Sequence, residues 1–84
     1  MTFRDIIAEL NPEALFMDGY DDCIIGICAR INQPSIVAYD VEKILTSLES
    51  QGMTPDEARE YFEFNQLGSY LGEHTPCFIQ TITP

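Results

Sequence analysis

The fold is decided most clearly by residues 54–68, which read Thr54-Pro55-Asp56-Glu57-Ala58-Arg59-Glu60-Tyr61-Phe62-Glu63-Phe64-Asn65-Gln66-Leu67-Gly68. Thr54 and Glu57 have the spacing of a capping box. Pro55 occupies the first helical position, where its missing N–H costs nothing. The stretch therefore predicts a helix that begins at Pro55 and loosens at Gly68.

One face of this helix is apolar except for an asparagine. Its members are Ala58, Tyr61, Phe62 and Asn65, with Phe64, Leu67 and Leu71 widening it. A buried amide has to be hydrogen-bonded, because an unsatisfied group costs about 1–3 kcal/mol. We therefore expect Asn65 to tie the helix to residues 72–76. Thr75 in that loop is expected to be a second structural polar residue.

The sequence before this helix predicts another helix and a hairpin. Phe3, Ile6, Ile7 and Leu10 have helical spacing, so residues 2–10 should form a helix capped by Thr2. Asn11-Pro12 should end it and start one further helical turn over residues 13–16. Residues 17–22 read as a turn in which Gly19 takes a positive φ.

Residues 23–31 form a continuous apolar run, which periodicity alone cannot assign to a strand or a helix. The isoleucines around Gly26 favour a strand, because β-branched residues suit strands and an interior glycine weakens a helix. With both faces apolar, this should be a central strand. Residues 32–34 read as a turn that leads into a second strand, Ser35–Tyr39.

Two further elements complete the chain. Asp40 should cap a helix from Val41 to about Gln51, with Gly52 just beyond its end. Apolar and polar side chains alternate sufficiently over residues 77–82 to predict a last strand. We therefore predict one α+β domain over residues 1–84, in the order helix, strand, strand, helix, helix, strand. Its three-stranded sheet should be mainly antiparallel and packed against the helices.

The extreme feature of the composition is its acidity. Fourteen acidic residues against four basic ones give a net charge of −10. Such a surface repels nucleic acid and membranes and favours partners with a basic surface. No apolar run approaches the roughly 18 residues of a membrane span, and residues 1–5 do not resemble a signal peptide. The expected location is the cytoplasm of a bacterial cell.

The cysteines and carboxylates match no metal or cofactor motif. The spacing of Cys23, Cys28 and Cys77, together with His74, is not that of a zinc site, so reduced thiols in a cytosolic protein are expected. The aspartates of residues 17–22 do not have the spacing of an EF-hand loop. No cofactor, metal or catalytic residue is predicted.

Two stretches resemble a known family. They are Ala14-Leu15-Phe16-Met17-Asp18-Gly19-Tyr20-Asp21-Asp22, continuing to Val37-Ala38-Tyr39-Asp40, and Glu60-Tyr61-Phe62-Glu63-Phe64-Asn65, continuing through Gly68 and Gly72-Glu73 to Thr75-Pro76. Over about residues 14–80 the chain resembles a family of small, acidic, uncharacterised proteins encoded by phages and prophages. The resemblance implies one compact domain and an association with phage, and it carries over no catalytic residue.

The candidate binding residues combine carboxylates with aromatic side chains. The aromatic residues after position 60 exceed what one helix face can bury, so Phe64 or Tyr70 should be exposed beside glutamates. The candidates are Asp18, Tyr20, Asp21, Asp22, Glu60, Glu63, Phe64, Tyr70 and Glu73.

Three functions compete for this sequence. The first is a non-enzymatic interaction protein, phage-encoded, that binds and modulates a host protein, with imitation of DNA by its carboxylates as a special case. The second is a structural homodimer joined by an exposed strand edge or aromatic patch. The third is a small metal-binding or hydrolytic protein that would need Asp18, Asp21, Asp22 and Glu73 to converge.

Overall fold

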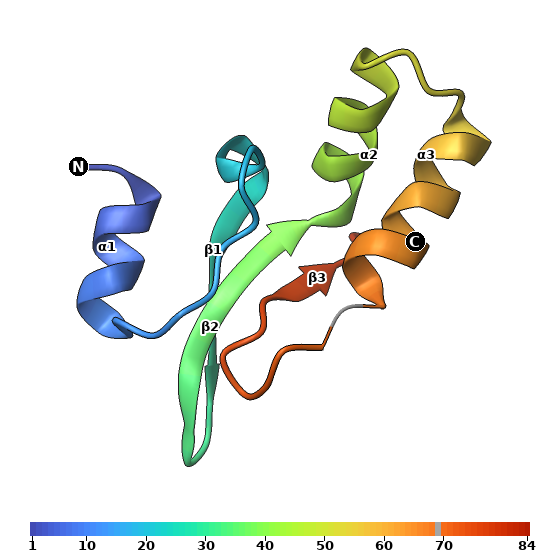
Figure 1. Ribbon diagram of the computed structural model, residues 1–84. Helices are drawn as coiled ribbons and strands as arrows, with labels where there is room; N and C mark the ends of the chain where they lie inside the picture. Colours follow the sequence, from blue (N-terminus) through green and yellow to red (C-terminus); the bar gives the residue numbers. More distant parts are fainter. Residues whose placement is uncertain (69) are drawn as a thin grey trace.

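The computed structural model describes residues 1–68 and 70–84 and confirms the predicted class and element order (Figure 1). Two of its short helical segments are a 3-10 helix, η1, and a π-helix, η2. In chain order the elements are α1 (Phe3–Leu10), η1 (Asp21–Cys23), β1 (Ile24–Arg30), β2 (Gln33–Asp40), α2 (Val41–Ser50), α3 (Pro55–Phe62), η2 (Glu63–Leu67) and β3 (Cys77–Ile79).

The sheet has the order β1-β2-β3 and is mainly antiparallel. The long β1–β2 pairing is antiparallel, and the three-residue β3 runs parallel to β2. The hairpin turn is at Ile31–Asn32 rather than at residues 32–34, with Asn32 in the left-handed region at φ 58°. The last strand ends at Ile79, three residues earlier than predicted.

The expectation that residues 23–31 form the central strand is wrong. β2 is central, and Ile36, Val37, Ala38 and Tyr39 are all buried because β2 is paired on both edges and packed on both faces. β1 is an edge strand with irregular pairing next to Ile25 and Ala29. The apolar run contains a bulged edge strand, which is why several of its isoleucines remain partly exposed.

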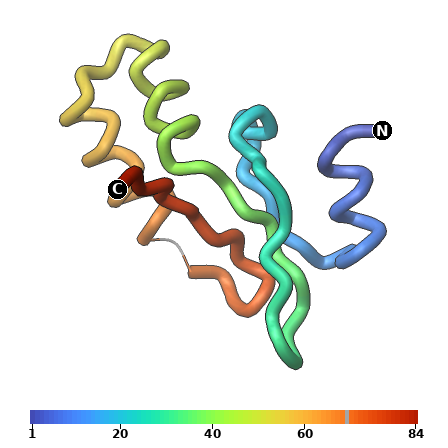
Figure 2. Tube along the Cα trace, turned by 180° about the vertical axis from the view of Figure 1, so that it is seen from behind, coloured from blue at the N-terminus to red at the C-terminus, as the bar shows by residue number. Residues whose placement is uncertain are grey.

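Figures 1 and 2 show α2 and α3 as an antiparallel pair at one end of the molecule, and α1 at the other end beyond the β1–β2 hairpin. The core lies between the sheet and the helix pair. Phe78 of β3 stacks on Tyr39 at 6.0 Å between ring centroids and meets the edge of Phe62 at 5.2 Å. These three rings join the sheet to α3.

The predicted helix caps are confirmed. Thr2 and Asp5 form a capping box at α1, and Thr54 and Glu57 form one at α3. Asp40 accepts a hydrogen bond from the Glu42 N–H at the start of α2. Gly52 follows α2 with φ 103°, and Gly19 has φ 88°, as their turn positions require.

The predicted apolar face of α1 is mostly not in the core. Ile7 is buried, but Phe3, Ile6 and Leu10 are exposed. The helix contacts both strands of the β1–β2 hairpin, and no other helix lies beside it in Figure 1.

The helical turn predicted for residues 13–16 is absent. This segment runs along the sheet, and its backbone groups are satisfied by distant partners. The Leu15 N–H donates to the His74 carbonyl at 3.3 Å. The Met17 N–H donates to the Tyr39 hydroxyl at 2.7 Å. These tertiary hydrogen bonds replace the local ones that a helix would make.

Candidate functional site

The nine candidate binding residues do not form one site. Asp18, Tyr20, Asp21 and Asp22 lie just before β1, whereas Glu60, Glu63, Phe64, Tyr70 and Glu73 belong to α3, η2 and the segment that follows. Residues 18–22 are separated from residues 60–68 and 70–73 in both Figure 1 and Figure 2. The molecule therefore offers two candidate regions.

In the first region, Arg4 neutralises part of the acidic turn. Its Nε lies 2.8 Å and 2.9 Å from the two carboxylate oxygens of Asp21, and its Nη2 lies 3.3 Å from Asp18. The guanidinium also lies over the Phe16 ring, 4.5 Å from its centroid. Tyr20 is half-buried against the core. These contacts give three of the four predicted residues a structural role.

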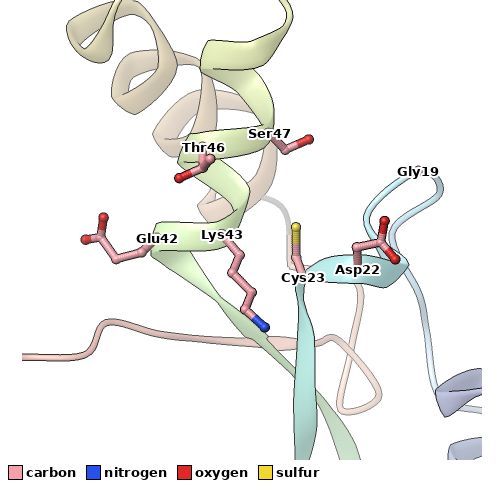
Figure 3. A pocket seen from close by; sticks show the side chains of 7 residues that line it. All are labelled: Gly19, Asp22, Cys23, Glu42, Lys43, Thr46 and Ser47. Atoms are coloured by element: carbon pink, nitrogen blue, oxygen red, sulfur yellow. The ribbon is translucent and has the colours of Figure 1, made fainter.

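A surface pocket of about 360 Å³ lies between this turn and α2. Asp22 and Cys23 face the side chains of Lys43, Thr46 and Ser47 across it (Figure 3). Burial raises the pKa of the Cys23 thiol, Asp22 raises it further, and Lys43 opposes them more weakly. The thiol is therefore protonated at neutral pH and is a poor nucleophile.

The carboxylates required for the third function do not converge. Asp18 and Asp21 are paired with Arg4, whereas the Glu73 carboxylate lies 3.8 Å from His74 Nε2 in the loop before β3. Within residues 1–68 and 70–84, no group of three or more His, Cys, Asp or Glu side chains is placed to hold a metal ion. The geometry gives a metal-dependent hydrolase no support.

The second region is an exposed apolar surface. We call it the η2 surface and define it by five side chains, which come from α3, from η2 and from residues 70 and 71. Phe64 and Tyr70 are both exposed, at 79% and 78%, and the others are exposed to at least 41%. Glu60, Glu63 and Glu73 are exposed around it. The η2 surface consists of Tyr61, Phe64, Leu67, Tyr70 and Leu71.

The π-helix explains why these side chains are exposed. Ala58 and Phe62 of α3 are buried as predicted, but the helix widens after Phe62. The backbone hydrogen bonds of a π-helix join residues i and i+5 rather than i and i+4. The side chains that follow are therefore rotated away from the face set by α3. Asn65 is exposed, contrary to expectation, and its Nδ2 donates to the Tyr61 carbonyl at 3.1 Å.

A small pocket of about 100 Å³ adjoins the η2 surface. Thr75 helps to shape it, because its hydroxyl accepts a hydrogen bond from the Leu71 N–H at 2.7 Å. The side-chain oxygen of Gln66 is buried there and has no hydrogen-bond partner among the residues that the structure describes. Its lining is Leu15, Phe16, Met17, Asn65, Gln66, Leu71, Thr75, Pro76 and Phe78.

Gln66 is the residue of this region that the sequence did not single out. A buried acceptor without a donor costs about 1–3 kcal/mol, and a binding partner that supplies an N–H or O–H would recover this. One glutamine among polar helix residues gives no sequence signal. Its position depends on the π-helix and on the packing of residues 15–17 against η2.

Comparisons with protein-family models, with curated proteins and with solved structures gave no match. In the described part of the chain, no helix has both the length and the apolar character needed to cross a membrane.

Proposed function

We propose that this chain is a non-enzymatic interaction protein that binds a basic host protein through the η2 surface. The observation that carries this proposal is the cluster of exposed aromatic and leucine side chains beside a pocket. The buried Gln66 oxygen of that pocket has no hydrogen-bond partner among residues 1–68 and 70–84. Large contiguous apolar patches are uncommon on monomers and mark interaction sites. Aromatic side chains in particular dominate the binding energy of interfaces.

The chemistry of the partner follows from the charges around this surface. Glu60, Glu63 and Glu73 are exposed at its rim, and the whole molecule carries a net charge of −10. A partner with Lys or Arg side chains around an apolar centre would be attracted over long range and would associate faster. A donor group on its central side chain would satisfy the Gln66 oxygen.

The resemblance of residues 14–80 to a phage-encoded family supports a host protein as the target and modulation of that target as the outcome. The DNA-mimic version of this function needs rows of carboxylates on one face. Here the carboxylates of Asp5 and Glu57 close capping boxes on α1 and α3, at opposite ends of the molecule. We therefore place the main contact on the η2 surface rather than on a row of acids.

The test is affinity capture from a bacterial lysate with matched variants, followed by titration of the captured protein. Wild type, Phe64→Ala, Glu60→Gln/Glu63→Gln and Phe3→Ala are compared at low and high salt. Phe3→Ala is the control, because Phe3 is also an exposed phenylalanine but lies on α1. We expect Phe64→Ala to weaken binding at least about tenfold, and the charge variant to slow association and reduce its salt dependence.

Two results would overturn this proposal. Equal capture by wild type and Phe64→Ala would show that the η2 surface is not the contact. Loss of binding in Phe3→Ala alone would move the contact to α1. If the captured protein normally binds DNA, competition between DNA and this chain would support the mimic version.

A further inference from the structure

His74 lies in the loop before β3, with an amide at one nitrogen of its ring and two carboxylates at the other. Its Nδ1 is 3.1 Å from Nδ2 of Asn11, the residue that ends α1. Its Nε2 is 3.5 Å from the Glu13 carboxylate and 3.8 Å from the Glu73 carboxylate. The side chain is 23% exposed. A titratable ring therefore connects the end of α1 to the loop that precedes β3.

Backbone groups fix the orientation of the Asn11 amide. Its Oδ1 accepts a hydrogen bond from the Glu13 N–H at 3.1 Å, and its Nδ2 donates to the Ser35 carbonyl at 2.8 Å. These two partners cannot exchange roles, because a backbone N–H only donates and a carbonyl only accepts. The other N–H of Nδ2 must therefore donate to His74. It follows that Nδ1 is an acceptor and that the neutral ring carries its proton on Nε2.

Protonation of this ring favours one set of contacts and opposes another. Imidazole side chains in general change charge between about pH 5 and pH 8. A proton on Nδ1 would face the Asn11 N–H, so two donors would meet and the hydrogen bond would be lost. The Glu13 and Glu73 carboxylates at Nε2 attract the charged ring. Arg30 brings a positive charge to the same loop, because its Nη2 donates to the Glu73 carbonyl at 2.8 Å.

The loop that contains His74 also supports the η2 surface. Glu73 is exposed at the rim of that surface. The Thr75 hydroxyl accepts a hydrogen bond from the Leu71 N–H at 2.7 Å, and Leu71 is a member of the surface. Leu15 and Thr75 both line the adjoining pocket, and the Leu15 N–H donates to the His74 carbonyl at 3.3 Å. A movement of His74 would therefore reach the η2 surface through its two chain neighbours.

We infer that His74 is a pH-sensitive switch that controls the η2 surface. While the ring is neutral, its hydrogen bond with Asn11 holds the loop against the end of α1. When the ring takes up one proton from solvent, this hydrogen bond breaks, the imidazolium moves toward Glu13 and Glu73, and the contact between Thr75 and Leu71 loosens. The consequence for binding rests on the proposed function: a partner at the η2 surface is held more weakly when His74 is charged.

The test is an NMR titration of the ¹⁵N-labelled full-length protein from about pH 8 to about pH 5.5, a range in which ordinary carboxylates stay ionised. The sequence contains one histidine, so every imidazole signal belongs to His74. At the alkaline end we expect long-range ¹H–¹⁵N correlations of the tautomer with its proton on Nε2. The side-chain amide of Asn11 and the backbone amide of Leu71 should then shift with the same midpoint as the ring.

Two variants test the cause of these shifts. His74→Asn keeps an amide oxygen near the position of Nδ1 and does not titrate in this range. Its Asn11 and Leu71 signals should therefore stay at their alkaline positions throughout. Glu13→Gln/Glu73→Gln removes the two charges that attract the imidazolium, so the midpoint should move to lower pH.

Three NMR results would each overturn this inference. They are a neutral ring with its proton on Nδ1, an Asn11 side-chain amide that does not follow the titration, and a Leu71 shift that is equally large in His74→Asn. The titration needs no partner, so a failure to capture a host protein would count against the proposed function alone. Where a host protein is captured, equal affinity at both ends of the pH range would overturn the control of binding by His74.

Discussion

Asn11 is the residue that holds the N-terminal segment to the rest of the molecule. It is buried, and its Nδ2 donates to the Ser35 carbonyl at 2.8 Å and to His74 Nδ1 at 3.1 Å. Its Oδ1 accepts a hydrogen bond from the Glu13 N–H at 3.1 Å. One amide thus joins α1 to β2 and to the loop before β3, which is the organising role that the sequence suggested for Asn65.

Asn11→Ala should therefore destabilise the protein clearly. The change removes three hydrogen bonds and leaves buried partners unsatisfied, so the free energy of unfolding should fall by about 1–3 kcal/mol. In a domain of this size each kcal/mol lowers the melting temperature by about 4–8 °C. Asn65→Ala is the matched control, and its effect should stay within about 0.5 kcal/mol because Asn65 is exposed. A larger loss in Asn65→Ala than in Asn11→Ala would contradict this assignment.

Tyr39 should make the free energy of unfolding depend on pH in the alkaline range. Burial raises the pKa of this phenol above 10.0 and outweighs the opposing hydrogen bond from the Met17 N–H. The folded state thus keeps a proton that the unfolded chain loses near pH 10, so stability present below pH 10 is lost as the pH rises through the folded pKa. Burial likewise raises the pKa of Cys23 and Cys77 above 9.0, so the loss should begin near pH 9.

We expect Tyr39→Phe to be less stable at neutral pH by about 1 kcal/mol, because the buried Met17 N–H loses its acceptor. Above pH 10 its melting temperature should fall less steeply than that of wild type. Thermal unfolding across this pH range measures both effects. Tyr70→Phe, a change at an exposed tyrosine, should keep the wild-type slope. Parallel curves for wild type and Tyr39→Phe would show that Tyr39 is not the titrating group.

At the scale of elements, short capping motifs in the sequence were sufficient to predict where the three α-helices begin. The capping boxes at Thr2 and Thr54 and the cap at Asp40 use residues within three positions of each other, so the sequence contains the whole interaction. Glycines in turns are equally local. These features made the α+β class and the element order predictable.

Elements whose state depends on distant partners were not predictable. The apolar run 23–31 and the strand 35–39 look equally suited to the centre of a sheet, and only the position of β3 makes β2 central. Residues 13–16 do not form the predicted helical turn. Instead, the Leu15 and Met17 N–H groups donate hydrogen bonds to the His74 carbonyl and the Tyr39 hydroxyl. The π-helix after Phe62 has no sequence signal, yet it positions Phe64 and Gln66.

At the scale of the whole molecule, the candidate site could be predicted only in part. An excess of aromatic residues on a short helix was visible in the sequence, and both Phe64 and Tyr70 are exposed. The separation of the acidic turn from the η2 surface depends on chain topology. Such long-range placement follows from strand order, which a single sequence leaves open.

Because of the net charge, we expect ionic strength to change both the stability and the self-association of this protein. With fourteen acidic residues and four basic ones, repulsion between carboxylates opposes the compact state. The same repulsion acts between two copies, and the bulges of β1 further hinder pairing at its edge. The protein should therefore be monomeric, and salt should stabilise it.

Raising the NaCl concentration from about 10 mM to about 150 mM shortens the screening length from about 30 Å to about 8 Å. We expect the melting temperature to rise by about 4–8 °C, which corresponds to about 1 kcal/mol in a domain of this size. Sedimentation velocity over the same series should show a monomer throughout. A flat or falling melting temperature would mean that repulsion does not limit stability. A dimer that forms as repulsion is screened would instead favour the homodimeric function, with the η2 surface as the first interface to test by Phe64→Ala.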